Sequence, residues 1–249
     1  MIFNNKKYTI PKITIGCESL GGTDWGNKDI KELTNVLNHA YENDYNCFDT
    51  ADVYGLGESE ERIGKIFKNK INDVFIITKF GIRWHTKEIN NRASTYKDLS
   101  INYMIEALEN SLRRLRIGAI PLYLIHWPDN QFEIEPVIDA MKKQKEKGKI
   151  INFGISNFTL KDIPSNLLNE IDAICNSFNL LDPISSKEIL SKGKKLDKSI
   201  FIYGTLAQGL LTGNYRLDTN FTSNDRRSRL PHFQSKNNKT LVAIINKII

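Results

Sequence analysis

The sequence has only three cysteines, Cys17, Cys47 and Cys175, and no two of them form a CxxC pair. An odd number of widely spaced cysteines argues against a disulfide framework and predicts a reducing, cytoplasmic location. No stretch approaches the roughly 20 apolar residues that a membrane span requires. The N-terminus, MIFNNKKYTIPK, also lacks the apolar core of a secretory signal. We therefore expect neither a membrane partner nor secretion.

Basic residues are not grouped in a way that predicts nucleic-acid binding. The formal net charge is +6, and the lysines are dispersed apart from small clusters such as KKQKEKGK at 142–149. No aromatic residues interleave with these lysines, although stacking on bases requires them. A solvated helix face therefore explains the cluster better than a nucleic-acid or phosphate-binding patch does.

The composition is that of an ordinary globular protein, with 40% hydrophobic and 26% charged residues. A chain of 249 residues suffices for one domain of α/β-barrel size or for two small ones. We expect one domain over 1–249, because short apolar runs alternate with amphipathic segments along the whole chain. The expected strands are 13–16, 45–49, 73–79, 121–126, 150–156, 171–177 and 198–204, and the expected helices are 29–44, 58–67, 100–116, 133–147, 159–168, 184–196 and 240–249.

Apolar strands that alternate with helices predict a parallel sheet covered by helices. An open doubly wound sheet would carry a GxGxxG loop after its first strand, but GCESLGGTDWG (16–26) is not such a loop. The predicted fold class is therefore α/β, a TIM-type (β/α)8 barrel. Only seven βα units can be counted, so the eighth unit is expected to be missing from this chain. The residues at 2–14 are expected to form a hairpin at the bottom of the barrel.

Polar residues stand at the carboxyl ends of these strands, where TIM barrels carry their chemistry. The second, third and fourth strands end in Asp49, Lys79 and His126, and Tyr54 follows in the loop after the second strand. Any one of these residues could be a structural cap or part of an ion pair. Four of them, on three successive strand ends and one adjoining loop, are better explained by a shared site. The later strands add Ser156, Asn157, Asn176 and Tyr203.

Proton delivery to an oxygen atom is the chemistry that suits the first set, Asp49, Tyr54, Lys79 and His126. A phenol has a pKa of about 10 and is a poor acid at neutral pH, but a neighbouring ammonium such as Lys79 lowers that pKa. Asp49 can supply the counter-charge to Lys79, and His126 can orient a substrate oxygen. We see no strong nucleophile and no metal-ligand spacing. The set therefore predicts that Tyr54 acts as a general acid while a hydride arrives at carbon.

Three tryptophans, Trp25, Trp84 and Trp127, fall in predicted loops at the same rim. Trp25 and Trp127 are the candidates for the walls of an apolar substrate pocket. Ordinary loop packing explains Trp84 equally well.

Several long motifs, in order over nearly the whole chain, resemble the aldo-keto reductase superfamily. They include FDTADVYGLGESEERIG (48–64), ITKFG (77–81), LYLIHWPD (122–129) and FGISNF (153–158). Two more, YGTLAQGLLTGNY (203–215) and RSRLPHFQ (227–234), are most similar to the branch of bacterial reductases and potassium-channel β-subunit-like proteins.

The resemblance implies a TIM-type barrel that binds NADPH, or NADH, and reduces a small-molecule carbonyl. It identifies Asp49, Tyr54, Lys79 and His126 as the catalytic tetrad, with Tyr54 as the acid. Two departures are visible: Asn176 stands where the family often has glutamine, and Gly204-Thr205 replaces the usual Ser-Pro. The implied cofactor-binding residues are Ser156, Asn157, Asn176 and Tyr203 at the nicotinamide, and Thr205, Leu206, Gln208 and Gly209 at the pyrophosphate.

Members of the family continue beyond the seventh helix with a unit that holds the adenosine phosphate, whereas this sequence stops partway into that helix. We expect the first and seventh strands to have unpaired edges, which favour self-association. Two functions therefore stay open: an NAD(P)H-dependent carbonyl reductase, and a catalytically impaired binding module or remnant. The substrate and the choice between NADP and NAD are open as well.

Overall fold

The structure is a computed structural model that describes residues 10–26, 28–87, 93–159, 163–182, 191, 198–216, 219–233, 240, 242–245 and 247. The side chains of 85–87 and 93 are not described. The expected hairpin at 2–14 and the expected helix at 184–196 lie largely outside these residues. None of the described helices is long and apolar enough to cross a membrane.

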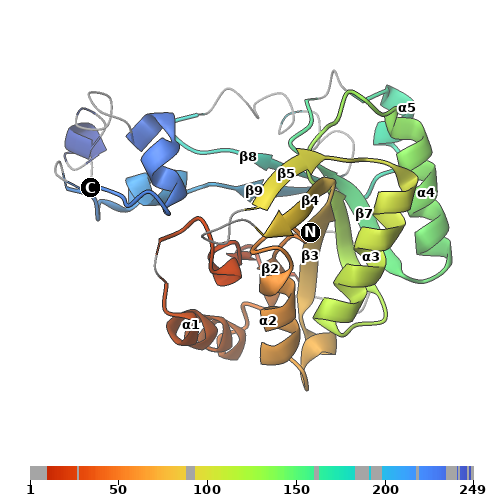
Figure 1. Ribbon diagram of the computed structural model, residues 1–249, viewed down its shortest axis with the longest axis horizontal. Coiled ribbons are helices and arrows are strands. Elements are labelled where there is room, and N and C mark those ends of the chain that lie inside the picture. Colours follow the sequence, from red (N-terminus) through yellow and green to blue (C-terminus); the bar gives the residue numbers. More distant parts are fainter. Residues whose placement is uncertain are drawn as a thin grey trace.

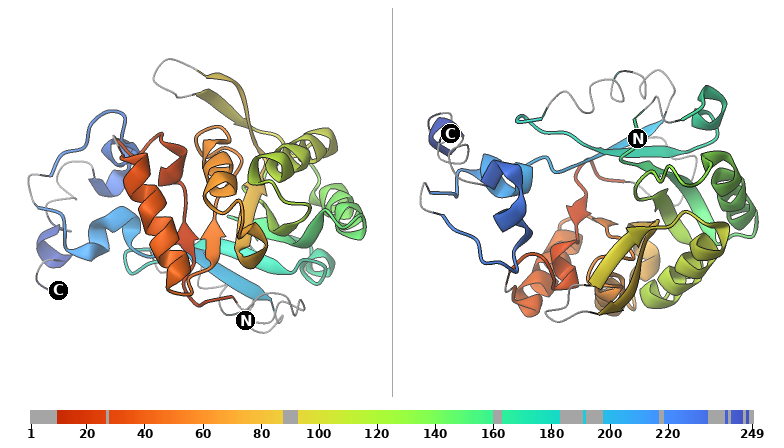
Figure 2. Two further views of the ribbon diagram at one scale, coloured as in Figure 1. Left: turned by 90° about the horizontal axis from the view of Figure 1, so that it is seen from below. Right: turned by 45° about the horizontal axis from the view of Figure 1, so that its top comes forward.

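Seven parallel strands form one curved sheet, with helices on its outer side (Figures 1 and 2). Each strand pairs with the next one along the order β1-β2-β3-β6-β7-β8-β9, as expected for a (β/α)8 barrel that lacks one unit. Within the described residues β1 and β9 are the outer strands of the sheet, and self-association through their edges stays a prediction. The strands are β1 (Ile15–Gly16), β2 (Cys47–Asp49), β3 (Phe75–Phe80), β6 (Ile120–Ile125), β7 (Ile150–Ser156), β8 (Ala173–Ser177) and β9 (Ser199–Tyr203).

The helices follow the amphipathic segments of the sequence to within a few residues. Asp29 caps the first helix, because its side chain accepts hydrogen bonds from the backbone nitrogens of Lys31 and Glu32 at 2.8 and 3.4 Å. The expected helix at 159–168 is reduced to one turn at 165–168, and the described residues of 240–247 are helical. The helices are α1 (Ile30–Glu42), α2 (Glu58–Ile66), α3 (Ile101–Leu115), α4 (Ile134–Glu146) and α5 (Ser165–Leu168).

One feature was not predicted: an antiparallel hairpin of β4 (Ile82–Lys87) and β5 (Ala93–Lys97) follows β3. Trp84, expected in a loop, lies on β4. The segment has no continuous apolar run, since β4 reads IRWHTK and β5 reads ASTYK. A two-stranded antiparallel ribbon does not need such a run, so hydrophobic patterning did not reveal it.

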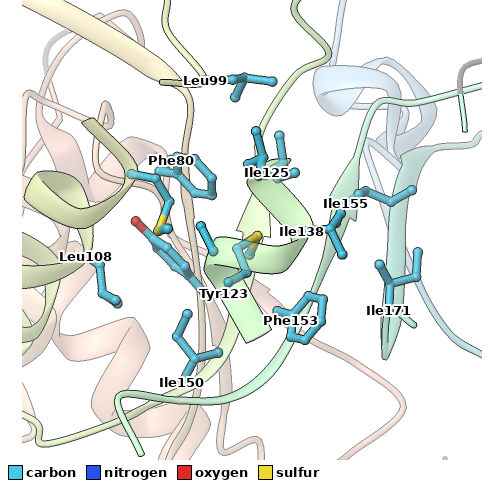
Figure 3. Close-up of a cluster of buried hydrophobic side chains, with 14 of the residues drawn as sticks. Phe80, Leu99, Leu108, Tyr123, Ile125, Ile138, Ile150, Phe153, Ile155 and Ile171 are labelled. Atoms are coloured by element: carbon cyan, nitrogen blue, oxygen red, sulfur yellow. The ribbon is translucent and has the colours of Figure 1, made fainter. Parts of the chain in front are cut away.

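Alternate positions of the strands face two different cores. Leu122 and Leu124 on β6 face the barrel interior, together with Phe75 and Ile77 on β3. Tyr123 and Ile125 face the opposite way and pack between the sheet and helices α3 and α4 (Figure 3). Strands buried on both faces explain why these runs are apolar throughout.

Candidate active site

The polar residues at the strand ends meet at one rim, as the parallel topology requires. Lys79, near the carboxyl end of β3, is 3% exposed. Its Nζ donates hydrogen bonds to Asp49 Oδ1 and to the backbone oxygen of Thr50, each at 2.7 Å. The same Nζ lies 5.4 Å from the centroid of the Tyr54 ring. The ammonium therefore faces a carboxylate on one side and a phenol on the other.

The pKa of Tyr54 differs from the expectation. The surrounding protein raises the pKa of the phenol well above its usual range, by burial first and then through the charges of Glu18 and Asp49. The pKa shift is therefore upward, opposite to the lowering predicted from Lys79. Within the described residues no group hydrogen-bonds to the hydroxyl. Tyr54 is consequently a neutral phenol at physiological pH, with a proton that it can donate.

His126 follows β6 directly and is 7% exposed. Its ring meets the Tyr54 ring edge-on, with the centroids 5.7 Å apart. Burial, assisted by the charge of Lys79, lowers the pKa of the imidazole well below its usual value. Nδ1 is buried without a hydrogen-bond partner among the described residues. His126 is therefore a neutral imidazole beside the phenol.

Tightly packed backbone holds the Tyr54 loop in place. A methyl group at Gly21 would lie only 2.6 Å from the Gly55 nitrogen and 2.8 Å from the carbonyl carbon of Tyr54. Gly21 belongs to the short 3-10 turn η1 (Ser19–Gly21), which follows β1. The turn after β1 thus packs directly on the backbone of Tyr54 and Gly55.

A polar network behind the tetrad was missed by sequence reasoning. Asp52 is 1% exposed, accepts a hydrogen bond from the Tyr103 hydroxyl at 3.1 Å, and donates its backbone N–H to the Lys79 oxygen at 3.2 Å. Burial, with a contribution from the charge of Glu60, raises its pKa well above the usual range. The position of Asp52 between Asp49 and Tyr54 could have identified it from the sequence.

Glu60 lies in the first turn of α2, where an exposed carboxylate would serve as a partner of the helix dipole. It is instead fully buried and accepts hydrogen bonds from Thr78 Oγ1 at 2.6 Å and Arg114 Nε at 2.7 Å. Thr78 precedes Lys79 on β3. The Glu60 carboxylate therefore links α2 and α3 to the strand that carries the ammonium.

Ser156, Asn157 and Tyr203 lie together on the next strand ends. The Asn157 amide donates to the His126 oxygen at 2.9 Å and to Ser156 Oγ at 3.1 Å, and it accepts from the Tyr203 hydroxyl. The Tyr203 side chain is 37% exposed at the end of β9. Asn157 therefore connects His126, which follows β6, to the Tyr203 ring, which is accessible to a ligand.

Asn176 uses its amide within the protein. Its Oδ1 accepts from the Asn157 backbone N–H, and its Nδ2 donates to the Phe158 oxygen, both at 3.1 Å. Both ends of the side chain are therefore engaged in supporting the loop after β7. Asn176, one methylene shorter than the glutamine that the family often has, therefore supports the backbone of Asn157.

The loop after β9 forms the turn η5 (Ala207–Thr212). Gln208 and Gly209 adopt left-handed backbone angles, with φ of 54° and 95°. Tyr215 supports the turn by donating its hydroxyl to the Gln208 oxygen at 2.7 Å. The backbone N–H groups of Ala207 and Gly209 donate within the turn, to the oxygens of Gly204 and Leu206, both at 2.9 Å. Thr205 and Leu206 enter this turn, and Leu206 is exposed.

Comparisons with known proteins identify the family of this chain. The model of the Aldo/keto reductase family matches residues 12–249. Aldo-keto reductase YhdN of Bacillus subtilis (strain 168) is 31% identical over 240 residues, which are 95% of this chain and 71% of the relative. The chain belongs to the aldo/keto reductase family.

Two other family members extend the comparison. Aldo-keto reductase yakc [NADP(+)] of Schizosaccharomyces pombe is 31% identical over 96% of this chain and 72% of its own length. The solved structure of the glycerol dehydrogenase AKR11B4 from Gluconobacter oxydans superimposes with a TM-score of 0.84 at 32% identity, over 96% of this chain and 76% of that one. The aldo/keto reductases are oxidoreductases, and their barrel is the fold observed here.

Trp25 and Trp127, the two tryptophans expected to form the walls of a substrate pocket, have different surroundings in this structure. Trp127 is 38% exposed, and the Lys97 ammonium lies 5.9 Å from its ring centroid. The Trp25 ring instead has the guanidinium groups of Arg226 and Arg227 at 5.8 and 5.4 Å. Cations therefore lie over both rings, and the two tryptophans differ in exposure, since Trp127 is exposed and Trp25 is half-buried.

Proposed function

We propose that this aldo/keto reductase reduces an aldehyde or ketone to an alcohol, with Tyr54 as the general acid. The main support is the contact of Lys79 with both Asp49 and the Tyr54 ring. Desolvating polar and charged groups is costly, so four of them packed this closely at the carboxyl ends of three strands indicate a functional site. The three buried, unbridged cysteines are in keeping with a cytoplasmic enzyme.

NADPH is the proposed cofactor, with NADH as the alternative, because the yakc relative carries NADP(+) in its name. When bound, it supplies the hydride. The residues present fit a dinucleotide: Tyr203 offers a partly exposed ring for a nicotinamide, and Ser156 and Asn157 lie beside it. The family resemblance assigns the pyrophosphate to Thr205, Leu206, Gln208 and Gly209, which lie in the turn after β9 and directly before it.

The residues of this chain handle the proton. His126, as a neutral imidazole, hydrogen-bonds to the carbonyl oxygen and directs it toward the Tyr54 hydroxyl. Tyr54 donates its proton to that oxygen as negative charge develops there. Lys79 stabilises the phenolate that forms, and Asp49 holds the ammonium in place. The high pKa of Tyr54 keeps the proton on the phenol until the oxygen becomes basic.

The substitution Tyr54→Phe tests this proposal. It removes one hydroxyl and is expected to lower kcat/KM for NADPH-dependent aldehyde reduction by about 10²–10⁴-fold, the usual contribution of a general acid. Absorbance loss of NADPH with a panel of aldehydes measures the rate. Tyr123→Phe is the matched control, because it deletes a buried hydroxyl that has no partner in the described part of the chain. We expect that control to retain wild-type kinetics.

Cofactor titration separates this proposal from a catalytically impaired remnant. Quenching of tryptophan fluorescence by NADPH should saturate in the micromolar range for wild type and for Tyr54→Phe alike. Wild-type rates in Tyr54→Phe would remove Tyr54 from the mechanism. An absence of saturation at millimolar NADPH would favour the remnant.

A further inference from the structure

Asp52 lies in the loop that carries Tyr54, and the mechanism proposed above gives its side chain no role. Two residues before it, the Thr50 oxygen accepts a hydrogen bond from Lys79 Nζ, and Tyr54 follows two residues after it. The Asp52 backbone N–H donates to the Lys79 oxygen at 3.2 Å. Its side chain, which is 1% exposed, contacts Tyr103 on α3. Asp52 therefore links the loop of the proposed acid to a helix on the outer side of the sheet.

The contacts of Tyr103 indicate the protonation state of Asp52. The Tyr103 hydroxyl lies 3.0 Å from the Ile82 oxygen and 3.1 Å from Asp52 Oδ2, but it has only one hydrogen to donate. A backbone carbonyl only accepts, whereas a carboxyl group donates when it is protonated. Both contacts are therefore complete when Tyr103 donates to Ile82 and a neutral Asp52 donates to Tyr103. A carboxylate would leave one of the two contacts without a hydrogen.

The surroundings of Asp52 favour the neutral acid as well. Among the residues that the structure describes, no cation pairs with Asp52, and its Oδ1 is buried without a hydrogen-bond partner. Arg83 and Arg114 line the same cavity as Asp52, but both guanidinium groups are already paired with other carboxylates. A buried carboxylate would therefore be uncompensated, which is costly. The titratable groups that face Asp52 are Glu60 of α2, Tyr103, Glu106 and Arg114 of α3, Arg83 of β4 and Tyr123 of β6.

Tyr103 is in turn held by the hairpin of β4 and β5. Its hydroxyl contacts the first residue of β4, and the Arg83 guanidinium lies 4.9 Å from its ring centroid. Arg83 pairs with Asp98, which follows β5, at 3.2 Å. A continuous series of contacts therefore runs from the hairpin through Tyr103 and Asp52 to the loop of Tyr54.

We propose that Asp52, as a neutral carboxylic acid, is a positioning residue that holds its loop on Tyr103 and thereby places the Tyr54 phenol beside the Lys79 ammonium. This inference rests on the proposed role of Tyr54 as general acid and deepens it. A purely structural role is the competing explanation. It predicts lower stability without Asp52 but an unchanged kcat for the protein that remains folded.

Three substitutions test the positioning role in NADPH-dependent aldehyde reduction. Asp52→Leu keeps the shape without the hydrogen bond and should lower kcat by about tenfold, with little change in KM, because a small displacement of a catalytic group impairs the reaction. Asp52→Asn restores a neutral donor of the same size and should retain most of kcat. Tyr103→Phe should lower kcat as much as Asp52→Leu does. The double variant should lose no more, since both changes remove the same contact.

Ser111→Ala is the matched control, because it deletes a buried hydroxyl of α3 that has no partner in the described part of the chain. We expect its kcat to stay within twofold of wild type. Equal kcat for wild type and Asp52→Leu, at a temperature where both are folded, would overturn the positioning role. A loss in Ser111→Ala as large as that in Asp52→Leu would do the same.

The neutral state of Asp52 is tested by stability. An aspartate in the unfolded chain has a pKa of about 3.9, whereas burial, with the charge of Glu60, raises the pKa of Asp52 well above that value in the folded chain. The stability of wild type relative to Asp52→Asn is therefore greatest below about pH 3.9. As the pH rises above this value, the folding equilibrium constant should fall by about tenfold per pH unit relative to that variant. Groups that titrate alike in the two proteins cancel in this ratio.

Urea denaturation of the two proteins from about pH 5 to 7 measures the ratio. A ratio that does not change with pH would show that Asp52 is ionised in the folded chain, and it would overturn the proposal.

These stability measurements need no turnover, so they separate this inference from the proposed function. A wild-type protein that reduces no aldehyde would contradict the proposed function alone. Hydrogen exchange of the backbone amides at 48–57, followed by mass spectrometry, then tests the positioning role. Faster exchange in Asp52→Leu and Tyr103→Phe, but not in Asp52→Asn, would support it. The same exchange rate in all four proteins would contradict it.

Discussion

The contact between Lys79 and Asp49 allows a quantitative prediction about this fold. Lys79→Met keeps most of the apolar stem and removes the ammonium. Two groups then lose their hydrogen-bond donor: Asp49 Oδ1 and the backbone oxygen of Thr50, a residue that is fully buried. The Asp49 side chain is only 19% exposed, so its charge would be largely uncompensated.

Breaking a buried ion pair by removing one partner costs about 3–5 kcal/mol. Asp49 retains some access to water, so we expect the lower end of this range, about 3 kcal/mol of unfolding free energy. A double-mutant cycle with Asp49→Asn should give a coupling energy of about 2 kcal/mol, within the range of contacting residues. Asp49→Asn alone should cost less, because the amide oxygen still accepts from the ammonium.

Urea denaturation followed by tryptophan fluorescence measures all four proteins of the cycle. Additivity of the two single substitutions to within about 0.5 kcal/mol would show that the two side chains do not interact, and it would refute the reasoning. In the proposed mechanism the ammonium stabilises the developing phenolate, so loss of Lys79 should also lower kcat far more than it raises KM for the aldehyde. A change in KM alone would contradict that role.

Two further predictions concern the surroundings of the tetrad. Because the folded state lowers the pKa of His126 below its usual 6.5, the unfolded chain binds more protons below that pH, and stability should fall as pH decreases through about 6.5. His126→Asn should flatten this slope in urea midpoints, and parallel slopes would contradict it. Gly21→Ala should cost about 1–3 kcal/mol and reduce kcat, since its methyl group overlaps the backbone at Gly55. Gly118→Ala is its control, because nothing lies within 4 Å of that position, and equal urea midpoints for the two variants would count against the packing argument.

Local patterns in the sequence determined much of this protein. Apolar runs such as PLYLIH became strands buried on both faces, and Asp29 became a helix cap, because both features depend on neighbouring residues. Parallel strands place their carboxyl ends at one rim, so Asp49, Lys79 and His126 could be expected to converge.

Only the tertiary structure decided which charges are buried and which partners they have. The sequence alone does not distinguish Glu60, which is buried against Arg114, from an exposed carboxylate at a helix start. It also does not indicate that Glu18 meets Arg226, because the two residues are more than 200 positions apart. The pKa of Tyr54 rises because desolvation depends on every element packed around the phenol, and that sum exists only after the chain has folded.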